Sequence, residues 1–327
     1  MVLILSKRDL EEVLTMKDTI DTVERAFAEF ARGNAEVPLR HIIFIEKYKG
    51  AILYMPAYLK ETDSLAIKTV SVFEENTKIN LPTILAVVLV NDPKTGMPIA
   101  LMEGSYITAM RTGAASGVAT RYLARKDAEI VGVIGAGVQA RTQLWAVCEI
   151  RDVKEAYVYS PTIEKAKAYC EEMTKKLGIR VLLADNIKDL VKKSDILILA
   201  TTAREPVIRG DWIRPGTHII SIGWMGKDAR ELDSDTVRKS KLVVDSREGV
   251  LSESGDILIP IKEGIVTEEH IYAEIGEIII GKKPGRVSDD EITLWKSVGS
   301  AILDAATAKL AYVKALERGI GMEVKLL

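Results

Sequence analysis

The chain has 327 residues, of which 47% are hydrophobic and 28% charged, and its formal net charge at pH 7 is −2. This length is sufficient for two domains, each with its own hydrophobic core. The near balance of acidic and basic residues offers no basic surface of the kind that nucleic acids require. No apolar run reaches the length of a membrane-spanning helix. We therefore expect neither nucleic acid nor a membrane as a partner.

The first residues, MVLILSKRDLEEVL, contain only a short apolar run and no small-residue cleavage site, so they do not resemble a secretory signal. We expect a cytoplasmic protein, in which Cys148 and Cys170 stay reduced. The histidines, His41, His218 and His270, are scattered without metal-ligand spacing. We expect no metal site.

The first hundred residues combine helical and strand patterns. Residues 13–33 carry apolar side chains at helical spacing and end at Gly33, a residue that favours a helix end. The strand-like segments that follow are RHIIFIE (40–46), GAILYMPAYL (50–59), SLAIKTVSVF (64–73) and TILAVVLVND (83–92). These elements predict an α+β domain. Residues 105–123 then predict a helix whose small side chains let another backbone or a ligand approach closely.

From residue 129 onward, short apolar runs alternate with helical segments. The runs are EIVGVIGA (129–136), EAYVYS (155–160), RVLLAD (180–185), ILILAT (196–201), HIISIG (218–223) and KLVVDS (241–246). This alternation predicts a doubly wound α/β domain of the Rossmann type, with a parallel sheet and crossover helices. Residues 289–319 predict a long helix that is interrupted near Gly299.

A glycine motif, G-x-G-x-x-A, follows the first predicted strand of this domain and opens a helix. In such a motif Gly135 makes a tight turn, Gly137 lets the backbone approach a pyrophosphate, and Ala140 lets the helix pack on the strand. The pyrophosphate then lies at the N-terminus of the helix. The motif predicts an NAD(P) site. The further residues expected at this site are Val138, Gln139 and Thr201.

The end of the second predicted strand indicates which dinucleotide binds. NAD sites carry an Asp or Glu there for the ribose hydroxyls, whereas this chain has Ser160, Pro161, Thr162 and Lys165. The missing acid slightly favours NADP(H) over NAD(H). The alternative interpretation is that Ser160 and Thr162 only cap the following helix.

Three cations lie in apolar sequence surroundings. Lys68 stands among apolar residues of a predicted strand, Arg40 begins another strand, and Arg111 lies in the helix of small residues. A buried ammonium without an anionic partner is costly, so Lys68 needs an anion, which a ligand can supply. Each cation taken alone is more often structural or solvated, and the sequence does not bring the three together.

The chain resembles the ornithine cyclodeaminase/μ-crystallin family from end to end. The stretches that carry the resemblance are VPLRH, YMPAYL, AIKTVSVF, LPTILAVVLVNDPKTGMPIALMEGSYITAMRTGAASGVA, IGAGVQAR, ARELD, SESGDI and SVGSAILDAATAK. The resemblance implies a homodimer. It also implies a substrate-binding and dimerisation domain of residues 1–117 and 298–327, completed by the C-terminal helix, and a Rossmann dinucleotide-binding domain of residues 118–297.

The resemblance also implies roles for individual residues. Arg40, Lys68 and Arg111 match the residues that bind the substrate carboxylate, and Lys68 is in addition catalytic. Thr112 lies beside this carboxylate clamp and is expected at the cofactor. The segment expected near the nicotinamide is Ser297, Val298 and Gly299.

Two positions depart from the cyclodeaminase pattern. The catalytic Asp of those enzymes is replaced here by Met225, although Asp228, three residues later, is a candidate substitute as a catalytic base. The acid that receives the side-chain amine of ornithine is replaced by Leu53. Both differences count against ornithine as the substrate.

Taken together, these features predict an NAD(P)H-dependent oxidoreductase that interconverts a small α-imino or α-keto acid and its L-amino acid. Activity of the Δ1-pyrroline-2-carboxylate reductase type is expected first and of the alanine dehydrogenase type second. The alternatives are an ornithine cyclodeaminase that uses NAD catalytically, and a protein that, like μ-crystallin, binds NADPH and a ligand.

Overall fold

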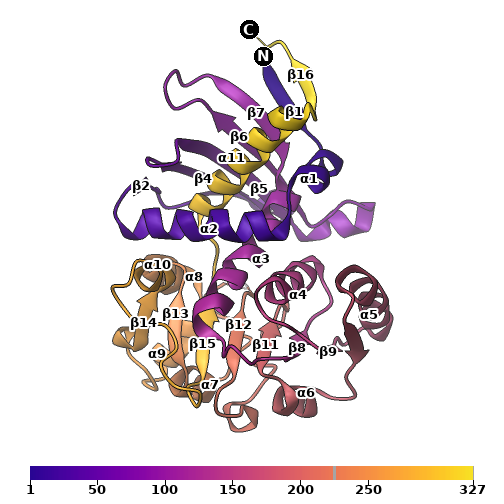
Figure 1. The fold of residues 1–327 in the computed structure, drawn as a ribbon, viewed down its shortest axis with the longest axis vertical. Coiled ribbons are helices and arrows are strands. Elements are labelled where there is room, and N and C mark those ends of the chain that lie inside the picture. The colour runs from indigo at the N-terminus through magenta and orange to yellow at the C-terminus, as the bar shows by residue number, and fades with distance from the viewer. Residues whose placement is uncertain (224–225, 327) are drawn as a thin grey trace. The chain divides into compact units, whose positions relative to one another are not determined.

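The computed structural model describes residues 1–223 and 226–326, and the chain divides into two compact units (Figure 1). Unit 1 comprises residues Met1–Arg111 and Ala301–Leu327, and unit 2 comprises Thr112–Ser300. Each unit is built on its own sheet.

Within the described residues, the sheet of unit 1 has eight strands, and neighbouring strands are antiparallel except for the parallel pair β1 and β7. In spatial order its strands are β16 (Met322–Val324), β1 (Val2–Leu5), β7 (Pro98–Glu103), β6 (Ile84–Asn91), β5 (Ser64–Phe73), β4 (Gly50–Leu59) and β2 (Ala35–Glu36), while β3 (His41–Ile45) pairs with β4. The four strands predicted in this part of the sequence therefore form adjacent members of one sheet.

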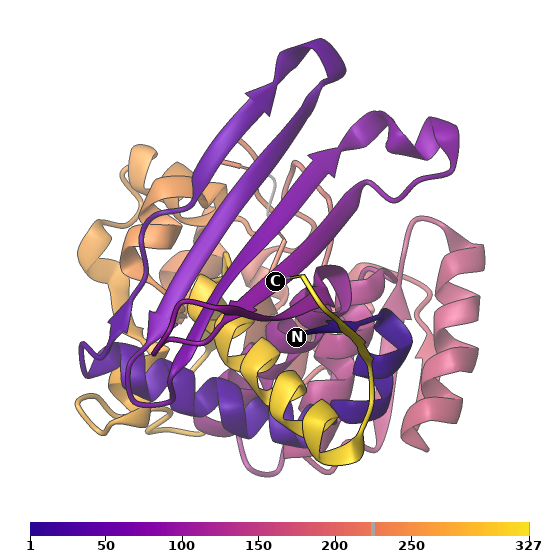
Figure 2. The same cartoon turned by 90° about the horizontal axis from the view of Figure 1, so that it is seen from above.

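Helices cover one face of this sheet. The helical elements of unit 1 are α1 (Lys7–Val13), α2 (Met16–Ala31) and α11 (Ala301–Arg318), with 3-10 turns η1 (Glu46–Tyr48) and η2 (Glu74–Ile79). Helix α11 packs against β4, β5 and β6, and α2 packs against α11 (Figure 2). Helix α2 begins where the Thr15 side chain accepts a hydrogen bond from the Asp18 backbone, and it buries Ile20 and Phe27.

The two faces of the unit 1 sheet differ sharply in exposure. Residues paired across the strands share a face, so Met55, Lys68 and Val88 lie in one row. All three of these side chains are buried. The opposite face exposes apolar side chains, including Leu85 at 41% and Val87 at 46% of their surface.

The sheet of unit 2 is entirely parallel. In spatial order its strands are β10 (Arg180–Leu183), β9 (Glu155–Tyr159), β8 (Ile130–Ile134), β11 (Ile196–Leu199), β12 (His218–Ser221), β15 (Thr293–Lys296), β13 (Lys241–Val244) and β14 (Ile271–Glu274). The order β10-β9-β8-β11-β12 is that of a Rossmann domain, with its topological switch between β8 and β11. The predicted doubly wound α/β class is confirmed.

Crossover helices connect these strands. They are α4 (Val138–Ile150), α5 (Ile163–Leu177), α6 (Ile187–Lys193), α7 (Ser234–Lys239), α8 (Arg247–Glu253), α9 (Gly255–Lys262) and α10 (Ile275–Ile279), with 3-10 turns η3 (Gly210–Trp212) and η4 (Glu268–His270). None of the helices in the described part of the chain is long and apolar enough to cross a membrane.

The predicted helix over residues 289–319 is wrong in its first part. Residues Thr293–Lys296 form strand β15, which is inserted between β12 and β13, and only Ala301–Arg318 are helical. All four residues of β15 are buried, and Trp295 donates a hydrogen bond to Ser116 at 3.2 Å. A short apolar run has no periodicity of its own, so the neighbouring strands decide its conformation.

Helix α3 (Gly104–Leu123) is rich in small residues, and its part from Thr112 onward packs closely within unit 2. A Cβ at Gly113 would lie 2.6 Å from the carbonyl oxygen of Thr142 on α4. At its C-terminal end, Arg151 donates to the carbonyl oxygens of Thr120 and Ala124 at 2.9 and 3.0 Å, and Arg286 donates to that of Leu123 at 2.6 Å. These arginines satisfy carbonyl groups that a helix end leaves unpaired.

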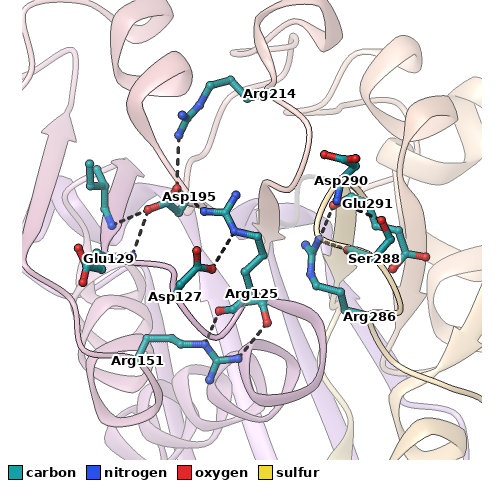
Figure 3. A network of polar contacts seen from close by, with 12 residues as sticks. Arg125, Asp127, Glu129, Arg151, Asp195, Arg214, Arg286, Ser288, Asp290 and Glu291 are labelled. Carbon is teal, nitrogen blue, oxygen red and sulfur yellow. Dashed lines mark hydrogen bonds and ion pairs between the residues drawn. The ribbon is translucent and has the colours of Figure 1, made fainter.

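Asp195 immediately precedes β11 and links chain segments at the amino-terminal edge of the unit 2 sheet (Figure 3). Its carboxylate accepts hydrogen bonds from Arg125 at 3.0 Å and from the backbone of Glu129 and Ile130 at 3.1 and 3.0 Å. The amino-terminal edge of the sheet is thus fixed by a structural network. Polar residues and a cavity lie at the opposite, carboxyl-terminal edge of this sheet.

Candidate functional site

A cavity of about 550 Å³ lies in unit 2, lined by the segments that follow β8, β9 and β11. Its position beside the switch between β8 and β11 is where doubly wound sheets bind dinucleotides. The predicted cofactor residues that line it are Gly135, Gly137, Ser160, Thr162, Lys165 and Thr201.

The two motif glycines are required for different reasons. Gly135 has a φ of +111°, and a Cβ there would lie 2.3 Å from the carbonyl oxygen of Ala200. Gly137 has a φ of −86°, which any residue adopts, and a Cβ there would meet open space. That space is part of the cavity in front of the N-terminus of α4, where a phosphate binds favourably. The residues present therefore fit a dinucleotide.

The segment after β9 contributes polar groups to the same cavity. The Ser160 hydroxyl accepts a hydrogen bond from the Thr162 backbone at 3.4 Å. Thr162 is the N-cap residue of α5, but its side chain makes no capping hydrogen bond within the described chain. Helix capping therefore does not account for the Thr162 hydroxyl. None of the described residues that line the cavity is an Asp or Glu.

The other six predicted cofactor residues, Thr112, Val138, Gln139 and Ser297–Gly299, lie outside the lining of this cavity. Val138 and Gln139 form the first turn of α4, where Val138 is 65% exposed. The Gln139 Oε1 atom is buried, and the described residues offer it no hydrogen-bond partner. Thr112 is buried in α3, immediately after Arg111.

The segment Ser297–Gly299 is organised by a carboxylate that the sequence analysis missed. Asp245, at the carboxyl end of β13, is buried, and its Oδ2 atom accepts hydrogen bonds from the Ser297 hydroxyl at 2.7 Å and from the backbone of Val298 and Gly299 at 3.0 and 2.7 Å. Its position after a predicted strand, in KLVVDS, was the available signal. Asp245 holds in place the segment that the family pattern puts near the nicotinamide.

In unit 1, Lys68 and Arg111 meet at the carboxylate of Asp304. Lys68 Nζ lies 2.8 Å from Asp304 Oδ2, and Arg111 Nε lies 3.0 Å from Oδ1. The side chains of Lys68 and Asp304 are each 2% exposed and that of Arg111 is 7% exposed. Lys68 thus has the anionic partner that its burial requires, and the protein itself supplies it, because α11 brings Asp304 onto β5 from far along the chain.

The cluster retains an excess of positive charge. Two buried cations share one carboxylate, and the charge of Arg40, which is half-buried, also acts on Lys68. The Arg111 Nη1 atom is buried, and no hydrogen-bond acceptor for it exists among the described residues. A buried guanidinium donor without an acceptor is costly unless a ligand supplies one. The charges of Arg111 and Arg40 thus both act on Lys68.

The ammonium of Lys68 is easier to deprotonate than that of an ordinary lysine. Its pKa is lowered from 10.5 to about 8, chiefly because burial disfavours the charged form. The carboxylate of Asp304 opposes this change, while the charges of Arg111 and Arg40 reinforce it. Lys68 is therefore able to hold or release a proton near neutral pH.

Asp304 was not singled out in the sequence analysis. It lies in ILDAATAK, where a carboxylate interrupts a run of small and apolar residues that are buried in α11. A charged residue on the buried face of a helix was the signal, since such a charge needs a partner.

The residues that bear on the two departures from the cyclodeaminase pattern belong to different units: Leu53 to unit 1 and Asp228 to unit 2. Leu53 is 5% exposed on β4 and pairs with Val70, so it lies on the same face as Lys68 and one row away. Asp228 is exposed in unit 2. Met225 lies outside the described residues.

Comparisons with known proteins agree with this architecture. Residues 2–319 match the model of the "Ornithine cyclodeaminase/mu-crystallin family". The structure of Thermococcus litoralis Δ1-pyrroline-2-carboxylate reductase, in complex with NADH and L-proline, is similar, with a TM-score of 0.96, 63% identity, and coverage of 99% of this chain and 100% of that one. An archaeal alanine dehydrogenase dimer with bound NAD matches with a TM-score of 0.93, 36% identity, and coverage of 100% and 99%.

A curated relative gives the same result. The Δ1-pyrroline-2-carboxylate reductase of Bacillus cereus is 37% identical over 325 residues, which cover 99% of this chain and 100% of the relative. These matches extend over both units. The chain therefore belongs to the ornithine cyclodeaminase/mu-crystallin family.

Proposed function

We propose that this protein is an NAD(P)H-dependent oxidoreductase that interconverts a small α-imino or α-keto acid and its L-amino acid, with Δ1-pyrroline-2-carboxylate as the first candidate. The observation that carries the proposal is the buried cluster with excess positive charge, in which Arg111 Nη1 lacks an acceptor among the described residues. A substrate carboxylate would supply that acceptor. The Thermococcus litoralis relative, solved with NADH and L-proline, supports the same substrate class.

Each part of the chemistry has a candidate group. NAD(P)H, when bound, supplies a hydride for the α-carbon of the substrate. Arg111 and Arg40 bind the carboxylate, because guanidinium groups offer a forked grip on two oxygens. Lys68 holds the proton that the imine nitrogen takes up on reduction, and in the reverse direction it accepts that proton. In this scheme Asp304 anchors the two buried cations.

The side chain of the substrate is proposed to be apolar. Leu53 and Val70 lie one row from Lys68 on the same face of the sheet, so the region beside the clamp is apolar. The ammonium group of ornithine would be buried there without a carboxylate, which is costly. A cyclic imine needs its carboxylate held, a hydride and one proton. Amination of pyruvate is the second candidate because it also requires ammonia and water to be handled at the α-carbon.

For the cofactor, we propose that NADPH is accepted as well as NADH and is slightly preferred. Ser160, Thr162 and Lys165 line the end of the cavity after β9, and they offer hydroxyl and ammonium donors to a ribose phosphate. The described lining holds no carboxylate that would repel the phosphate. The relatives solved with NADH and NAD support a dinucleotide of this type.

We also propose a homodimer formed through the uncovered face of the unit 1 sheet. Leu85, Val87 and Leu101 are exposed on this face of the single chain, opposite the side covered by α11. A contiguous apolar sheet face is typical of a protein interface. The alanine dehydrogenase relative is described as a dimer.

The substrate assignment is tested by following nicotinamide absorbance with three substrates. We expect the fastest oxidation of NAD(P)H with Δ1-pyrroline-2-carboxylate, a slower reaction with pyruvate and ammonia, and little release of proline and ammonia from L-ornithine with catalytic NAD⁺. Rapid proline formation from ornithine, with negligible reduction of the other substrates, would establish a cyclodeaminase instead. Dinucleotide binding without turnover of any of these substrates would favour a binding protein.

The cofactor proposal predicts that NADPH binds at least as tightly as NADH, because the site after β9 carries donors in place of an acid. Parallel fluorescence titrations of the protein with the two reduced dinucleotides measure this. The matched variant Lys165→Met should weaken NADPH binding more than NADH binding. NADPH binding roughly a hundredfold weaker than NADH binding, about 2.7 kcal/mol, would refute the proposal.

The clamp predicts that Arg111→Lys lowers kcat/KM by roughly 10- to 100-fold, since a forked pair of charge-assisted hydrogen bonds is replaced by a point charge. The thermal midpoint should fall only slightly, because the lysine keeps a positive charge beside Asp304. Arg25→Lys, at an exposed position of helix α2, is the control and should leave kcat/KM unchanged. A variant that unfolds while its folded fraction keeps full kcat/KM would show that Arg111 is purely structural.

The pKa of Lys68, about 8, predicts a pH dependence with opposite sign in the two directions. The protonated form, present below this pKa, is required for reduction, so kcat/KM for imine reduction should fall as pH rises through about 8. For oxidation of the L-amino acid it should rise over the same range. If pH profiles of kcat/KM recorded with two different substrates share one midpoint, the titrating group belongs to the enzyme. A midpoint that moves with the substrate would contradict the assignment to Lys68.

A further inference from the structure

Unit 2 contains a second group of buried charges, which the proposed chemistry does not use. Glu231, Asp256 and Lys296 are 2%, 3% and 1% exposed; Lys296 is the last residue of β15, Glu231 lies in the segment after β12, and Asp256 lies in the first turn of α9. Buried charges of this kind are costly to maintain unless each is paired and hydrogen-bonded. Their contacts therefore indicate what they hold in place.

The carboxylate of Glu231 is surrounded by hydrogen-bond donors. Its Oε1 atom accepts from the Ser221 hydroxyl at 2.8 Å and from the Gly223 backbone at 2.9 Å. Its Oε2 atom accepts from the Thr201 hydroxyl at 2.9 Å and from the Thr201 backbone at 3.3 Å. One carboxylate thus joins the end of β12 to the residue after β11 that lines the dinucleotide cavity.

The other two charges complete a closed network around Glu231. Lys296 Nζ donates to Asp256 Oδ2 at 2.6 Å, to the Gly223 carbonyl oxygen at 2.7 Å and to the Ser221 hydroxyl oxygen at 3.1 Å. Asp256 Oδ1 accepts from the backbone of Glu231 at 2.8 Å. Burial and the charge of Asp256 raise the pKa of Glu231, and the charge of Lys296 opposes that rise. Lys296 pairs directly with Asp256 and is the positive charge of this three-residue group.

We infer that Glu231 is a positioning residue of the dinucleotide site: it holds Thr201 in the cavity wall and Gly223 two residues beyond the end of β12. The inference rests on the proposed function, in which the cavity beside Gly137 receives NAD(P). Thr201 and Gly223 each direct a backbone donor to the same side chain. The cavity wall and the end of β12 therefore share one anchor, and loss of that anchor changes cofactor binding.

Both oxygen atoms of the Glu231 side chain must accept hydrogen bonds in this geometry. The four donors leave no room for a donor group on residue 231, since each oxygen already receives two hydrogen bonds. A glutamine in its place must turn its NH₂ group toward either Thr201 or the pair Ser221 and Gly223. Two donors would then face each other in a buried site, which is costly. Glu231→Gln is thus a nearly isosteric change with a specific consequence.

The test is the affinity for NADH, measured by fluorescence titration without substrate, together with the thermal midpoint and the KM for the imino acid. We expect Glu231→Gln to raise the Kd for NADH by roughly tenfold or more, because hydrogen bonds to a charged group are lost. The KM for the imino acid at saturating NADH should stay within about twofold, since the proposed carboxylate clamp belongs to unit 1. The matched control is Glu291→Gln, a carboxylate of unit 2 that bonds to Lys241 and the Val287 backbone, and it should leave the Kd unchanged.

Ser221→Ala provides a second variant that does not alter Glu231 or the residues lining the cavity. It removes one donor to Glu231 Oε1, and we expect the Kd for NADH to rise about threefold. If Glu231→Gln does not fold, an unchanged Kd in Ser221→Ala overturns the inference. An unchanged Kd in folded Glu231→Gln, or an equal rise in Glu291→Gln, also overturns it. Failure of the wild-type protein to bind NADH would instead refute the proposed function.

Discussion

The buried carboxylate of Asp304 is the contact on which the proposed chemistry of unit 1 depends. It pairs with Lys68 and Arg111, two buried cations from separate elements. Loss of one partner of such a buried group costs roughly 3–5 kcal/mol, because a charge is left without compensation. The two cations share a single carboxylate. The Arg111 Nη1 atom has no hydrogen-bond acceptor among the described residues. In the proposed function, a substrate carboxylate would make up that deficit.

A similar arrangement recurs at the carboxyl-terminal edge of the unit 2 sheet. Asp245 holds residues 297–299, and Glu231 holds Thr201 and Gly223. In a parallel sheet the segments that follow neighbouring strands meet at this edge, and their backbone donors need acceptors. Buried carboxylates supply those acceptors without occupying the cavity itself. The space in front of Gly137 is thus left for the cofactor phosphates.

The two units divide the proposed work between them. Unit 1 provides the carboxylate clamp and a lysine whose pKa, near 8, suits proton transfer, while unit 2 provides the dinucleotide cavity. The family contains reductases and dehydrogenases of imino and amino acids among the relatives of this chain. In the proposed function, the apolar row of Leu53 and Val70 beside Lys68 favours a substrate with an apolar side chain over one with an amine. The physical basis of this distinction is the cost of burying an unpaired ammonium.

The sequence by itself determined the family, the doubly wound class of unit 2, the glycine motif and the identity of the three cations. The family followed from the resemblance of whole stretches such as IGAGVQAR, and individual strands followed from local alternation, as in residues 50–59 and 64–73, which the structure reproduces as β4 and β5. Tertiary structure decided the rest. Residues 293–296 became a strand because a place between β12 and β13 was available, and Asp304 became the partner of Lys68 because α11 packs on β5. Contacts between residues far apart in the chain leave little trace in local periodicity, so the anchoring roles of Asp304, Asp245 and Glu231 emerged only when the strands and helices were assembled.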